Sequence, residues 1–116
     1  MAVEDGAVLG KLLGLHEKSG RTSSTPSVLA LYESLRKHRT TLNVQGANEN
    51  RKLYHMVPED VTKQRRDEQL AELQWGEESN SFPWSWGRYS YLKDLLGFDS
   101  IANAEQEFQD FQKSSR

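Results

Sequence analysis

The segment TPSVLALYESLRKHRTTL (residues 25–42) carries the clearest helix signal in the chain. Thr25 can accept a hydrogen bond from a free backbone N–H, and Pro26 fits the first helical turn because its missing N–H costs nothing there. Apolar side chains then recur at spacings of three and four from Val28 to Leu42, with Arg39 as the polar exception on that face. We therefore predict a helix from Thr25 to about residue 42.

Working outward from this helix, start and stop signals predict four more helices and no strand. The first covers residues 2–18 and ends before Gly20, and the third begins at Pro58. The fourth covers residues 84–96, and the fifth follows a cap at Asp99 or Ser100. Residues 43–50 are polar and lack a helical period, so they are predicted to form a loop that could act as a hinge. The expected fold is all-α, a compact bundle of about five short helices in one domain spanning residues 1–116.

The composition supports helices but only a thin core. The chain holds 14 Leu against seven Ile and Val residues together, and β-branched residues favour strands. Leu, Ile, Val and Phe make up 25 of the 116 residues, about 22%, just above the roughly 20% at which a charged chain tends towards disorder. We therefore expect that association into a homo-oligomer could complete the core.

Several classes of function find little support in the sequence. The chain has no cysteine, which excludes disulfides and thiolate metal sites. The three histidines are scattered without metal-ligand spacing, and no serine lies in a nucleophile elbow. No apolar run reaches the length of a membrane span, and Glu4 and Asp5 stand where a signal peptide would be basic. We expect an intracellular (cytoplasmic or nuclear) protein with no membrane span, no cofactor, no metal and no enzymatic activity.

Two features point to contacts with another protein. Gly6, Gly10 and Gly14 recur every four residues, so they line one side of a helix and would let another backbone approach closely, inside the fold or across a dimer. In the aromatic segment 82–91, Trp84 and Tyr91 fall off the predicted apolar face of their helix. They are therefore candidate surface anchors for a protein partner.

The charge distribution suggests an alternative. Residues 1–35 carry a net charge of −1, residues 36–66 carry +5, and residues 67–116 carry −6. A basic block of this kind can bind the phosphates of RNA or DNA. The candidate residues for such a surface are Arg36, Lys37, Arg39, Arg51, Lys52, Lys63, Arg65 and Arg66.

Our leading hypothesis from the sequence is a helical interaction module without enzymatic activity, which self-associates and docks to another macromolecule. The alternative is an RNA- or DNA-binding protein that uses segment 36–66. The small size and thin core are also typical of accessory proteins of viruses or mobile elements, although no residue carries that assignment.

Overall fold

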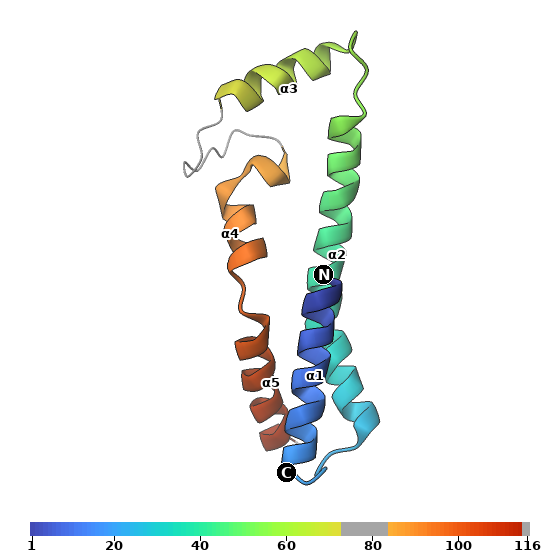
Figure 1. Ribbon diagram of the computed structural model, residues 1–116, viewed down its shortest axis with the longest axis vertical. Helices are drawn as coiled ribbons and strands as arrows, with labels where there is room; N and C mark the ends of the chain where they lie inside the picture. Colours follow the sequence, from blue (N-terminus) through green and yellow to red (C-terminus); the bar gives the residue numbers. More distant parts are fainter. Residues whose placement is uncertain (73–83, 115–116) are drawn as a thin grey trace. The chain divides into compact units, whose positions relative to one another are not determined.

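The computed structural model describes residues 1–72 and 84–114, and within these ranges the fold is all-α, as predicted (Figure 1). It contains five α-helices and one short 3₁₀ helix, and no strand among the described residues. The α-helices are α1 (Ala2–Lys18), α2 (Thr25–Tyr54), α3 (Val61–Glu72), α4 (Tyr89–Gly97) and α5 (Ser100–Ser114), and the 3₁₀ helix η1 covers Ser85–Gly87.

The chain divides into two compact units. Unit 1 comprises residues 1–42 and 99–116, and unit 2 comprises residues 43–98. Helix α2 contributes its first part to unit 1 and its second part to unit 2. The expectation of one folding domain stays a prediction.

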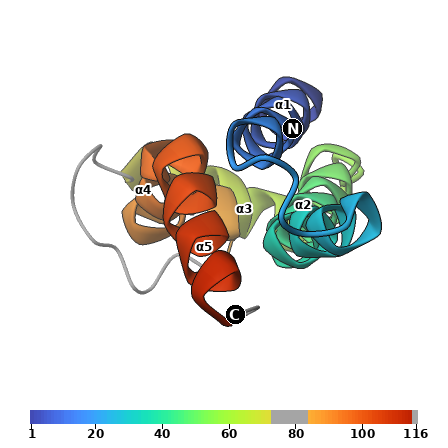
Figure 2. The same ribbon diagram turned by 90° about the horizontal axis from the view of Figure 1, so that it is seen from below.

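Unit 1 is built from α1, the first part of α2, and α5, which Figure 2 shows nearly end-on. Each of the three helices contributes to one interior, because apolar residues three or four apart share a face. The fully buried side chains of this core are Val8, Leu12, Val28, Ala104 and Phe108. Around them pack Leu15, Leu31, Tyr32, Leu35 and Phe111.

The ends of the unit 1 helices follow local chemistry, with one correction. Ser24, and not Thr25, caps α2, because the Ser27 N–H donates to Ser24 Oγ at 3.3 Å. Of the two predicted caps of α5, Asp99 and Ser100, the structure shows Asp99, since its carboxylate accepts from the N–H groups of Ile101 and Ala102 at 3.1 and 2.9 Å. Gly20 closes α1 with a φ of +73°, a conformation that glycine adopts without strain.

The predicted loop at residues 43–50 is wrong, because α2 continues without interruption to Tyr54. A hinge in this segment stays a prediction. The inward positions of α2 there are Asn43, Gly46, Asn50 and Leu53, which are buried or half-buried at spacings of three, four and three. The inward positions therefore recur at helical spacing, but three of the four are asparagine or glycine and not apolar side chains. A search for periodic apolar side chains cannot detect such a face.

Gly46 provides the closest packing of unit 2. A Cβ atom at this position would lie 2.5 Å from the Tyr91 hydroxyl and 2.9 Å from Nε1 of Trp86. The rings of Trp86 and Tyr91 are 6.0 Å apart, within the range of favourable aromatic pairs. One turn along α2, Glu49 accepts a hydrogen bond of 2.6 Å from the Ser85 hydroxyl. The glycine thus allows an aromatic pair to pack against the backbone of α2.

The third and fourth predicted helices begin later than expected. Asp60 caps α3 by accepting from the Thr62 N–H at 2.8 Å, so Pro58 and Glu59 precede the helix. The predicted helix at 84–96 is divided into η1 and α4 at Arg88, whose backbone is extended. This break places Tyr91, and not Leu96, against α2, and Leu96 is 79% exposed.

We predict that replacing Gly46 by alanine destabilises the protein by about 1–2 kcal/mol, as is usual for overpacking. Without a clash, alanine would stabilise the helix by about 1 kcal/mol relative to glycine. A decrease in the free energy of unfolding would therefore indicate the clash. Urea unfolding monitored by circular dichroism measures this free energy. Adding Tyr91→Phe removes the hydroxyl that a new Cβ would meet and should restore most of the loss. A stabilising Gly46→Ala change would contradict this packing.

Candidate functional site

A partly buried ion cluster joins α1 to α2 in unit 1. The guanidinium of Arg36 donates from Nε to Asp5 Oδ1 at 2.7 Å and from Nη1 to Glu4 Oε1 at 2.6 Å. Arg39 donates from Nε to the same Glu4 oxygen at 2.6 Å. The side chain of Arg36 is only 5% exposed, so its charge depends on these carboxylates for compensation.

The cluster lowers the pKa of Glu4 from 4.5 to about 2. The hydrogen bond from Arg39 is the largest cause, and it outweighs the burial of the carboxylate, which acts in the opposite direction. The hydrogen bond and charge of Arg36 lower the pKa further. Desolvation would lower the pKa of Arg36, but the hydrogen bonds that Arg36 donates to Asp5 and Glu4 reverse this and raise the pKa. Both groups therefore stay ionised across the physiological range.

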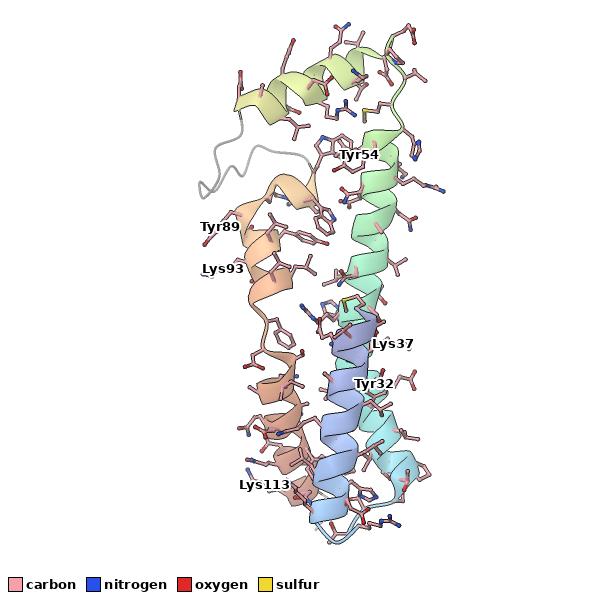
Figure 3. The ribbon with its side chains drawn as sticks, in the orientation of Figure 1. Tyr32, Lys37, Tyr54, Tyr89, Lys93 and Lys113 are labelled. Carbon is pink, nitrogen blue, oxygen red and sulfur yellow. The ribbon has the colours of Figure 1, made fainter. Side chains whose placement is uncertain are left out.

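The structure divides the eight candidate nucleic-acid contacts into two groups. Four of them are already engaged: Arg36 and Arg39 with the α1 acids, Lys63 with Asp67 at 2.9 Å, and Arg66 with Asp67 and with the carbonyl of Leu53. The other four are exposed: Lys37 in unit 1 and Arg51, Lys52 and Arg65 in unit 2. Figure 3 labels Lys37 on the first part of α2. Fewer side chains are thus available for phosphates than the sequence suggested, and nucleic-acid binding stays a prediction.

The two aromatic candidates are half-buried and not on an open surface. The Trp84 indole Nε1 and the Tyr91 hydroxyl are both buried, and neither has a hydrogen-bond partner in the described part of the chain. Both Tyr91 and Trp86 face Gly46, but Trp86, which the spacing assigned to the core, is 38% exposed. The extended backbone at Arg88 interrupts the predicted helix, so the residues that face α2 differ from those that a continuous helical spacing predicts. The sequence offered one signal for Gly46: the glycine continues the helical spacing of the buried side of α2.

Gly6, Gly10 and Gly14 form an open stripe. All three are exposed, and a Cβ atom built on any of them would find no atom of the described chain within 4 Å other than its chain neighbours and the backbone of its own helix. The expected close contact within the fold is therefore absent from the described residues, and a contact with another molecule stays a prediction. Exposed neighbours extend the stripe into a surface, which we call the glycine face of α1: Ala2, Val3, Gly6, Ala7, Gly10, Leu13 and Gly14.

From Ala2 to Gly14 the glycine face carries no charged side chain, but the exposed carboxylate of Glu17 lies on the same arc one turn further along α1, where it pairs with Arg21. At 100° per residue its members span an arc of about 140° on the helix. The charged side chains of the same length of α1 lie on the opposite side and form ion pairs: Glu4 and Asp5 with α2, and Lys11 with Glu105 of α5. A helix on the surface of a soluble domain ordinarily shows the reverse pattern, with charges towards water. Val3, at 88% exposure, illustrates the inversion.

Other kinds of site receive little support from the described residues. In ranges 1–72 and 84–114, no three histidine, aspartate or glutamate side chains are grouped so that they could hold a metal ion. In the same ranges, no helix combines the length and the apolar character that crossing a bilayer requires.

Comparison with known proteins gives one informative similarity. A stretch of 105 residues is 38% identical to FAD-dependent monooxygenase OpS4 from Beauveria bassiana (strain ARSEF 2860). The match includes 90% of this chain but only 23% of that protein, so the chain spans about a quarter of the length of the curated relative it matches. No family model matches the chain, and no solved structure matches it.

We predict that replacing Glu4 by glutamine destabilises the protein at pH 7 by up to about 3 kcal/mol, the free energy equivalent of its pKa shift. The folded-state pKa of Glu4 is lowered to about 2. Its stabilisation is therefore complete above about pH 5 and is lost as the pH falls towards 2. Urea unfolding at pH values from 2 to 7 should show a smaller loss of stability on acidification for the variant than for the wild type. Parallel curves would contradict the role of Glu4.

We predict that Gly10→Ala stabilises the isolated chain by about 0.5–1 kcal/mol, because alanine favours a helix and its methyl group meets open space. Thermal unfolding of the purified chain tests this result, with Gly97→Ala as a matched control on the exposed end of α4. A destabilised Gly10→Ala variant would show that something already covers this face in the isolated chain.

Proposed function

We propose that this chain is a helical docking module of the FAD-dependent monooxygenase type, which packs against a flavin-binding portion and completes its fold. The observation that carries the proposal is the 38% identity over 90% of the chain to a monooxygenase about four times its length. In such a protein the equivalent segment belongs to one polypeptide with the remaining three quarters. Contacts between the two parts are therefore expected.

The sequence supports a division of labour in which the module itself supplies no catalytic group. Dinucleotide-binding folds use a G-x-G-x-x-G turn that brings the backbone close to the pyrophosphate. The glycines of this chain stand at positions 6, 10, 14, 20, 46, 76, 87 and 97. No two of them are separated by a single residue, so this sequence does not contain that motif. The flavin and its redox chemistry would then be supplied by the partner portion, with the helical module stabilising it.

The interaction hypothesis drawn from the sequence thereby gains a specific partner. Docking to a flavoprotein portion needs an uncovered surface on the module, and unit 1 offers the glycine face. Nucleic-acid binding needs a cluster of available cations, and half of the candidate cations already have acidic or carbonyl partners. The docking reading is the one that both the surface and the similarity support.

The proposal predicts that this chain can replace the matched segment of the B. bassiana monooxygenase. We expect a chimera with this replacement to keep bound FAD through gel filtration, measured from the flavin absorbance per mole of protein. A version with a glycine–serine linker of equal length serves as the control and should lose most of its flavin, because the helical packing is missing. Equal flavin contents of the chimera and the linker version would overturn the proposal.

A further inference from the structure

We draw no further inference here: the strongest candidate, the stripe of small residues on the glycine face of α1, is exposed in the described part of the chain, but nothing in the structure shows what covers it.

Discussion

The buried guanidinium of Arg36 is the constraint on which unit 1 depends. A charge that is 5% exposed requires compensation, and the two adjacent carboxylates of Glu4 and Asp5 supply it from another helix. Because both acids lie in the first turns of α1, this pairing fixes the rotation of α1 about its own axis. The core side chains Val8 and Leu12 then point inward, and the side of α1 opposite to the acids is turned outward.

The exposed surface follows from this rotation. An ordinary amphipathic helix would place its acids in water and its small residues inside. In α1 the acids Glu4 and Asp5 form ion pairs with α2, Lys11 pairs with Glu105 of α5, and the glycines are left uncovered, whereas the exposed Glu17 pairs with Arg21. The inner side of α1 therefore stabilises unit 1 with charges and apolar side chains together. The outer side is left free for a contact that the described chain does not make.

Unit 2 relies on a different device. Its close packing comes from Gly46, where the lack of a side chain admits the Tyr91 hydroxyl and the Trp86 indole. An ion cluster fixes the orientation of a helix, whereas a glycine contact fixes its separation from a neighbour. The buried Tyr91 hydroxyl and Trp84 Nε1 have no partner in the described part of the chain, so shape complementarity has a larger part in this packing than hydrogen bonding.

The sequence alone determined the helical class, the whole of α1 and the start of α5 after a cap at Asp99 or Ser100, because these depend on local period, capping and composition. It also marked Arg39 as a polar residue on an apolar face and the glycines of α1 as a stripe. Only the tertiary structure decided that α2 continues through residues 43–50, since the inward face there is made of glycine and amides that form no apolar period. It also decided that Arg36 and Arg39 are engaged by the acids of α1 and that the glycine stripe points outward. The physical reason is that ion pairs such as Glu4 with Arg36 join residues 32 positions apart, and no local pattern encodes which charges will meet.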